Sequence, residues 1–196
     1  NDLTHLPREL TLENLEINIT IQLPFSPNNI LKNLLFHGAS KFAQPNSKSY
    51  YSQCEKTEYT VKIYNKTDHY NWLKRETNRS LAGNTLSAKE RIAKEFLRDK
   101  IESELKPNLL RFEVKFTRMN TLNKVGVFNV FDLLNSKLYP SIREIVLDMF
   151  DEVYFYDYTM NTEKMKTSEL SLIKDLRNPN YWLGLSKSQR YEKKKR

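Results

Sequence analysis

Two stretches of strict alternation between apolar and polar residues constrain the fold more than any other feature of the sequence. In residues 15–23 every odd position is Leu or Ile and every even position is polar. In residues 110–117 Leu, Phe and Val alternate in the same way with Arg, Glu, Lys and Thr. A period of two is that of a β-strand with one buried face. The chain is therefore predicted to build a sheet with one apolar face on a core and one open polar face.

Local signals place the other elements. Ser26 and Pro27 supply an N-cap and a first helical position, and Gly38 suits the end of that helix. Ser87 and Glu90 form a capping box before a run with helical spacing. The predicted elements are a helix at about 27–37, strands at 50–54 and 59–65, a helix at 87–105 and a strand at 110–116. The apolar residues expected to face inward from the second helix are Ile92, Phe96, Leu97, Ile101 and Leu105.

This order of elements is strand, helix, strand, strand, helix, strand, which predicts an α+β, ferredoxin-like split βαβ fold. In that fold both helices cover one face of an antiparallel sheet, the strands at 15–23 and 59–65 are central, and the strand at 110–116 lies beside the first. The predicted organisation is a ferredoxin-like core over 12–118, an α-rich extension over 119–186 and a disordered basic tail over 187–196. Within the extension we expect helices at 129–137, 140–151 and 168–176 and a tyrosine-rich strand at 153–159.

Composition excludes several classes of protein. With 196 residues, of which 39% are hydrophobic, the chain can bury a core, and no stretch approaches the roughly 18 apolar residues of a membrane-spanning helix. We therefore expect neither a disordered chain nor a membrane partner. A single cysteine, Cys54, excludes an internal disulfide, and three scattered histidines predict no zinc site, so the expected location is cytoplasmic. The start at Asn1, without Met, predicts a piece cut from a longer polypeptide.

The net charge of +8 favours an anionic partner, but most of it lies in the tail. Residues 187–196 hold six basic side chains and one acidic one, so these ten residues carry +5 and the other 186 carry +3. A basic arm of this kind adds contacts to phosphates without sequence specificity. The tail residues predicted to contact nucleic acid are Lys193, Lys194, Lys195 and Arg196.

Alternation also identifies the side chains of the open sheet face, because each strand turns its apolar set toward the core. The predicted members of the open face are Glu16, Asn18, Thr20, Glu58, Thr60, Lys62, Tyr64, Lys66, Arg111, Glu113 and Lys115. Neighbouring strands lie about 5 Å apart, so Glu16 and Glu113 could share a divalent cation. A tyrosine hydroxyl beside such an ion could attack a phosphodiester, with a lysine stabilising the developing charge. The alternative is that the carboxylates simply pair with lysines across strands.

Four segments, taken in order and spacing, resemble the phage and plasmid replication initiators of the filamentous-phage gene II/X type. They are LEINIT at 15–20, SYY at 49–51, VKIYNK at 61–66 and LLRFEVKF at 109–116. The resemblance covers roughly residues 12–135. Those initiators are rolling-circle, relaxase-like nicking enzymes. The paired-histidine metal motif of many relaxase-like nickases does not occur in this sequence.

The resemblance implies nicking of single-stranded or hairpin DNA at an origin, with a tyrosine retained on the 5′ phosphate and a free 3′ hydroxyl for a host polymerase or helicase complex. The implied nucleophile is Tyr64 or Tyr51. The other residues that the resemblance implies are Lys66 or Lys62 as phosphate-facing cations, and Glu16 and Glu113 as ligands of Mg²⁺ or Mn²⁺. Arg111 and Lys115, on the same open face, are predicted to contact nucleic acid. Two other hypotheses stay open, a non-catalytic nucleic-acid-binding module with the same sheet and an interaction domain made cationic only by its tail.

Overall fold

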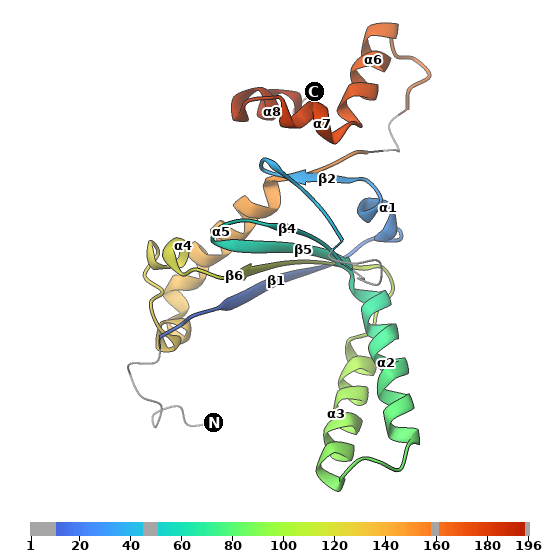
Figure 1. The fold of residues 1–196 in the computed structure, drawn as a ribbon, viewed down its shortest axis with the longest axis vertical. Helices are drawn as coiled ribbons and strands as arrows, with labels where there is room; N and C mark the ends of the chain where they lie inside the picture. The colour runs from blue at the N-terminus through green and yellow to red at the C-terminus, as the bar shows by residue number, and fades with distance from the viewer. Residues whose placement is uncertain (1–10, 45–50, 158–160, 195–196) are drawn as a thin grey trace.

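The computed structural model describes residues 11–44, 51–157 and 161–194, which form a mixed α+β fold with two antiparallel sheets. The strands are β1 (Leu15–Gln22), β2 (Leu34–His37), β3 (Ser40–Lys41), β4 (Tyr51–Glu55), β5 (Tyr59–Asn65), β6 (Leu109–Phe116) and β7 (Val153–Phe155). The helices are α1 (Asn28–Leu31), α2 (Lys66–Ala82), α3 (Ala88–Glu104), α4 (Asn120–Asn123), α5 (Tyr139–Asp151), α6 (Thr167–Leu176), α7 (Pro179–Leu183) and α8 (Lys187–Lys194), with short 3-10 helices η1 (Val130–Leu134) and η2 (Ser136–Leu138). One sheet has the order β1-β6-β5-β4 (Figure 1), and the other has the order β3-β2-β7.

The strand order of the larger sheet differs from the ferredoxin-like expectation. β6 lies between β1 and β5, so β1 is an edge strand and β6 is central. The reason is the connection between β5 and β6. The chain leaves the sheet at Asn65, runs through α2 and α3, and returns at Leu109 to the same end of the sheet, where Asn65 pairs with Leu110. A connection that returns to the end it left joins antiparallel strands, whereas the crossover of a split βαβ unit joins parallel ones. Here β6 pairs directly with both β5 and β1.

Helices α2 and α3 form a hairpin that projects away from the end of the larger sheet (Figure 1). The predicted helix at 87–105 is confirmed as α3, with the Ser87–Glu90 capping box in place. The sequence predicts no element over 67–86, because this stretch is polar and contains Asn, Gly and Ser, yet residues 66–82 form α2. The hairpin is closed at its base by Thr67, whose hydroxyl donates to the carbonyl of Lys106 at 2.7 Å.

Two residues expected to face inward from α3 are instead on the surface. Ile92 and Phe96 are 67% and 72% exposed, whereas Ile101, nearer the sheet, is buried. Because the hairpin projects beyond the sheet, the outer half of each helix lies away from the sheet and beside the other helix (Figure 1). The helix at 87–105 therefore does not cover the sheet.

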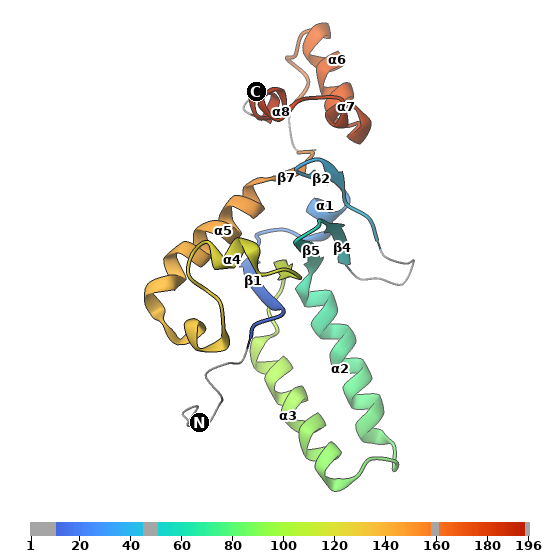
Figure 2. The same cartoon turned by 60° about the vertical axis from the view of Figure 1, so that its left-hand side comes forward.

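The apolar face of the larger sheet is covered by the second half of the chain (Figure 2). The buried members of this core are Val61, Ile63, Leu110, Phe112, Val114, Phe116, Leu122, Val127, Ile142, Val146, Met149 and Val153. They join strands of segment 12–118 to α4, α5 and β7 of segment 119–186. One hydrophobic core thus spans both predicted segments.

The predicted helix at 27–37 is only partly formed. Its first residues make α1, but the chain extends into β2 from Leu34, and Gly38 stands in the β2–β3 turn at a φ of +57° rather than at a helix end. The predicted strand at 153–159 is confirmed over Val153–Phe155, which pair with β2. Tyr158 lies outside the described residues.

The C-terminal helices pack on the smaller sheet through a buried tryptophan. Trp182 contacts Phe36 and Tyr154, with ring centroids 5.4 and 5.2 Å apart. Residues 187–194, predicted to be disordered, form α8, and Arg190 on this helix donates to the carbonyl of Gly38 at 3.0 Å. Within the described parts of the chain, none of the helices combines the length and apolar character needed to cross a membrane.

Candidate active site

Five of the predicted open-face side chains meet on the larger sheet. The Tyr64 hydroxyl donates to Oε2 of Glu113 at 3.2 Å, and Lys62 Nζ lies 3.0 Å from Oε1 of the same carboxylate. Lys62 Nζ is also 3.7 Å from Oε2 of Glu16, and Arg111 Nε is 3.5 Å from Oε2 of Glu113. Pairing of the strands accounts for this cluster, because Lys62 lies opposite Glu113 and Tyr64 lies opposite Arg111. The predicted grouping of these side chains on one face is confirmed.

The Glu113 carboxylate is the centre of the cluster. Glu113 is only 4% exposed, yet Tyr64, Lys62 and Arg111 all approach its two oxygens. Burial alone would lower the pKa of Lys62, but the hydrogen bond and charge of Glu113 outweigh burial and raise that pKa. The buried carboxylate is therefore held by cations and a hydroxyl.

The Tyr-Asn-Lys segment at 64–66 turns the chain from strand to helix. Asn65 is the N-cap of α2, and its side-chain oxygen accepts from the backbone N–H of Asp68 at 3.1 Å. Lys66 is consequently the first residue of α2 and not a sheet residue as predicted. Its ammonium still reaches the cluster, 4.2 Å from the ring centroid of Tyr70 and 5.9 Å from that of Tyr64. Burial, together with the charge of Arg111, lowers the pKa of Lys66.

The first turn of α2 adds two residues that the sequence reasoning did not identify. The ring of His69 meets that of Tyr64 edge-on, with centroids 5.6 Å apart. Burial and the nearby charges of Lys66 and Arg111 lower the pKa of His69 to about 4. Tyr70 donates to Glu104 on α3, and burial with this contact raises its pKa to about 12. The spacing of Lys66, His69 and Tyr70 is that of one helix face, a signal that becomes readable only once α2 is known.

The second candidate nucleophile, Tyr51, also lies on the open face. It is directly opposite Tyr64, and residues paired in this way share a sheet face. Lys62 Nζ lies 5.7 Å from the ring centroid of Tyr51. Tyr51 is half-buried, whereas Tyr64 is only 5% exposed. Both tyrosines thus flank Lys62.

The other predicted site residues are more scattered. Lys115 lies on β6 opposite Glu16. Glu58 precedes β5 and is not part of the open face, because its carboxylate accepts from Thr121 Oγ1 at 2.7 Å and from Asn120 Nδ2 at 3.2 Å. Lys193 is on α8, which lies beyond the smaller sheet (Figure 1), and it lines the same cavity as Trp182. The side chain of Lys194, and all of Lys195 and Arg196, lie outside the described residues.

The predicted metal pair, Glu16 and Glu113, is bridged by the Lys62 ammonium. Among residues 11–44, 51–157 and 161–194, no group of three or more His, Cys, Asp and Glu side chains is arranged to hold a metal ion. Mg²⁺ commonly uses one or two carboxylates and completes its shell with waters and phosphate oxygens. The two glutamates fit that pattern only with a phosphate present and with Lys62 displaced from between them.

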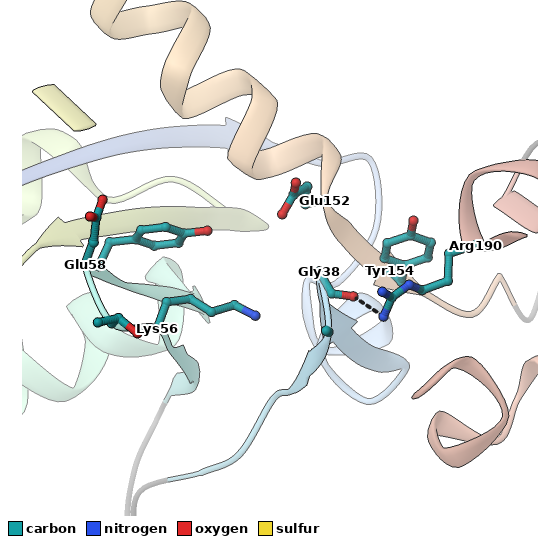
Figure 3. Close-up of a pocket in the computed structure, with 9 residues that line it drawn as sticks. Gly38, Lys56, Glu58, Glu152, Tyr154 and Arg190 are labelled. Atoms are coloured by element: carbon teal, nitrogen blue, oxygen red, sulfur yellow. Dashed lines mark hydrogen bonds between the residues drawn. The ribbon is translucent and has the colours of Figure 1, made fainter. Parts of the chain in front are cut away.

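A separate cavity of about 470 Å³ lies between the β4–β5 turn and the β2–β3 turn, with Glu152, Tyr154 and, from α8, Arg190 also in its lining (Figure 3). Two cations in its lining make hydrogen bonds to backbone carbonyls. Lys56 Nζ donates to the carbonyl of His37 at 3.0 Å, and Arg190 donates to the carbonyl of Gly38. Lys56 also donates to Ser40 Oγ at 2.8 Å. These contacts attach the β4–β5 turn and α8 to the β2–β3 hairpin. The cavity is therefore best explained as part of the packing of this hairpin.

No protein-family model, curated protein or solved structure matches the chain.

Proposed function

We propose that the open face of the larger sheet binds single-stranded DNA and cleaves one of its phosphodiester bonds by transferring the 5′ phosphate to a tyrosine. This is the reaction implied by the resemblance to rolling-circle replication initiators. The observation that supports it best is the hydrogen bond from the Tyr64 hydroxyl to the buried carboxylate of Glu113. A phenol held by a carboxylate, with Lys62 and Arg111 beside the same carboxylate, combines a nucleophile, a base and two cations.

In the proposed reaction the Tyr64 oxygen attacks phosphorus as its proton passes to Glu113. A bond forms between the tyrosine oxygen and phosphorus, and the bond from phosphorus to the 3′ oxygen breaks. The 3′ oxygen takes up a proton from solvent water and leaves as a hydroxyl, and the 5′ phosphate stays on the protein. Lys62 and Arg111 stabilise the negative charge that grows on the phosphoryl oxygens. Mg²⁺ or Mn²⁺ held by Glu16 and Glu113, with Lys62 moved from between them toward the phosphoryl oxygens, would further polarise phosphorus.

Tyr51 is the alternative nucleophile within the same proposal. It is more exposed than Tyr64, and Lys62 Nζ lies 5.7 Å from the centroid of its ring. In that arrangement Tyr64 positions Glu113 rather than attacking phosphorus. The two assignments predict opposite effects of removing each hydroxyl.

The test is formation of a covalent adduct with fluorescent single-stranded and hairpin oligonucleotides, in Mg²⁺ or Mn²⁺, followed on a denaturing gel. We expect an adduct with the wild-type chain, loss of at least about 100-fold in Tyr64→Phe, and near-normal adduct in Tyr51→Phe. Tyr139→Phe is the matched control, since this exposed tyrosine bonds only locally, to the carbonyl of Leu133. Wild-type levels of adduct in both Tyr64→Phe and Tyr51→Phe would contradict the tyrosine mechanism.

The low exposure of Tyr64 and Glu113 favours a second candidate, a nucleic-acid-binding module without catalysis. In this case the pair stabilises the sheet, and the cations around it bind the DNA backbone. The same oligonucleotides would then bind with salt-dependent affinity. Binding without an adduct in either metal supports this candidate over the first.

A further inference from the structure

A cavity of about 430 Å³ lies in the corner where the α2–α3 hairpin meets the end of the larger sheet. Its lining residues are Thr20, Gln22, Tyr70, Ser103, Glu104, Lys106, Leu109 and Arg111. They come from the end of β1, from α2, from the end of α3 and its following turn, and from the start of β6. The α2–α3 hairpin, which connects β5 to β6, thus forms one wall of this cavity.

Arg111 connects the cavity to the Tyr64 cluster. It lies opposite Thr20 on β1 and opposite Tyr64 on β5, so it lies midway between the two. Its Nε is within ion-pair range of Glu113 but makes no hydrogen bond among the described residues. A phosphate bound by Arg111 would therefore lie between the cavity and Tyr64.

The lining suits a nucleotide better than an apolar ligand. Thr20, Gln22 and Ser103 are exposed neutral side chains that can donate and accept hydrogen bonds, and such side chains read the edges of bases. The Ser103 hydroxyl donates to the carbonyl of Lys100 at 2.8 Å, which leaves its oxygen as an acceptor toward the cavity. Lys106 and Arg111 supply two cations, whereas the Glu104 carboxylate is engaged by Tyr70.

We propose that this cavity binds the base of the nucleotide next to the phosphate held at Tyr64. Arg111 and Lys106 would contact the flanking phosphates, while Thr20, Gln22 and Ser103 would hydrogen-bond the base. The α2–α3 hairpin then serves as the wall that fixes the position of the strand on the sheet. This inference rests on the proposed function, because it takes single-stranded DNA as the ligand of the open face.

The test uses a series of single-stranded oligonucleotides in which one abasic nucleotide occupies each position in turn. Their affinity is measured by fluorescence anisotropy with the Tyr64→Phe variant, which cannot form the adduct through that residue. If one base enters the cavity, one abasic position should weaken binding by about 5-fold or more. The same measurement with Thr20→Val and Gln22→Ala added should lose most of that position-dependent effect, because two of the three groups that hold the base are gone. Both substitutions are at exposed edge-strand positions, so the sheet is retained.

A charge-reversal pair provides the matched control. Lys106→Glu, in the cavity, should weaken binding of the intact oligonucleotide, whereas Lys89→Glu, at an exposed lysine at the far end of the hairpin, should not.

An abasic profile that is flat, or unchanged by the Thr20 and Gln22 substitutions, overturns the inference. Adduct formation by the wild-type chain would in that case still support the proposed function. A position-dependent profile without any adduct supports the cavity and contradicts the catalytic proposal. Failure of the chain to bind any oligonucleotide contradicts both.

Discussion

Lys62 and Glu113 lie directly opposite each other on β5 and β6, with Nζ of the lysine 3.0 Å from Oε1 of the glutamate. The glutamate side chain is 6% exposed and that of the lysine 22%. Removal of one partner from such a pair leaves a charge that is largely cut off from water. The pair is thus expected to contribute to stability as well as to any chemistry at Tyr64.

Lys62→Met should lower the free energy of unfolding by about 2 kcal/mol, because the Glu113 carboxylate loses its closest cation. Urea unfolding measures this loss. Lys115→Met, on the same face of β6 but opposite the more exposed Glu16, should cost no more than about 0.5 kcal/mol. The double variant Lys62→Met with Glu113→Gln should lose less free energy of unfolding than the sum of the losses in the two single variants. Equal losses from the Lys62 and Lys115 substitutions would count against this account.

Stability should depend on His69 at acidic pH. In the folded chain the pKa of His69 is about 4, against an ordinary value of 6.5. Above pH 6.5 the histidine is neutral in both states and adds no pH dependence. As the pH falls from 6.5 toward 4 the unfolded chain binds a proton that the folded chain does not, so the free energy of unfolding decreases, by about 2–3 kcal/mol in total.

His69→Phe keeps an aromatic ring against Tyr64 but removes the titration. Comparison of urea unfolding at pH 7 and pH 4.5 should therefore show a smaller loss for His69→Phe than for the wild-type chain. His37 and the carboxylates are the same in both proteins, so their contributions to the pH dependence of the free energy of unfolding cancel in the comparison. Parallel losses in the two proteins would show that His69 does not carry the effect.

The N-terminus of α3 should depend on its capping box. Ser87→Ala removes the side-chain acceptor for the backbone N–H of Glu90 and should destabilise α3 by about 1 kcal/mol. Ser80→Ala on α2 is the control. The Ser80 hydroxyl only donates to the carbonyl of Glu76, one turn earlier, and alanine favours the helix, so this change should be neutral or slightly stabilising. Hydrogen exchange of the α3 amides distinguishes the two variants.

The C-terminal helices should detach locally when Trp182 is removed. Trp182 is buried against Phe36 and Tyr154, and its indole N–H donates to the carbonyl of Leu176 at 2.6 Å. Trp182→Ala should cost about 3–5 kcal/mol of local stability and expose α6–α8 to limited proteolysis, while the larger sheet stays protected. Leu183→Ala, at the exposed neighbouring residue, should leave the cleavage pattern unchanged. Uniform cleavage of the whole chain in Trp182→Ala would show that the two parts unfold together.

Much of the candidate site could be predicted because it depends on the direction of strand side chains. Glu16, Lys62 and Glu113 share a face whatever the order of their strands, since alternation sends every second side chain to the same side. His69 and Tyr70 could not be predicted in this way. They belong to a helix whose polar composition gives no amphipathic signal and which is stabilised by packing on α3, including an ion pair of 2.8 Å between Lys74 and Glu102.

The sequence by itself determined which side chains of β1, β5 and β6 face the core and which face outward, where α3 begins, and that the fold is α+β. Only the tertiary structure decided that β6 is central, that α4 and α5 cover the sheet, and that the α2–α3 hairpin forms a corner beside Arg111. The physical reason is the range of the interactions. Side-chain direction and helix capping depend on a few neighbouring residues, whereas the choice of strand partner and of the helix that covers a sheet depends on contacts between residues far apart in the chain.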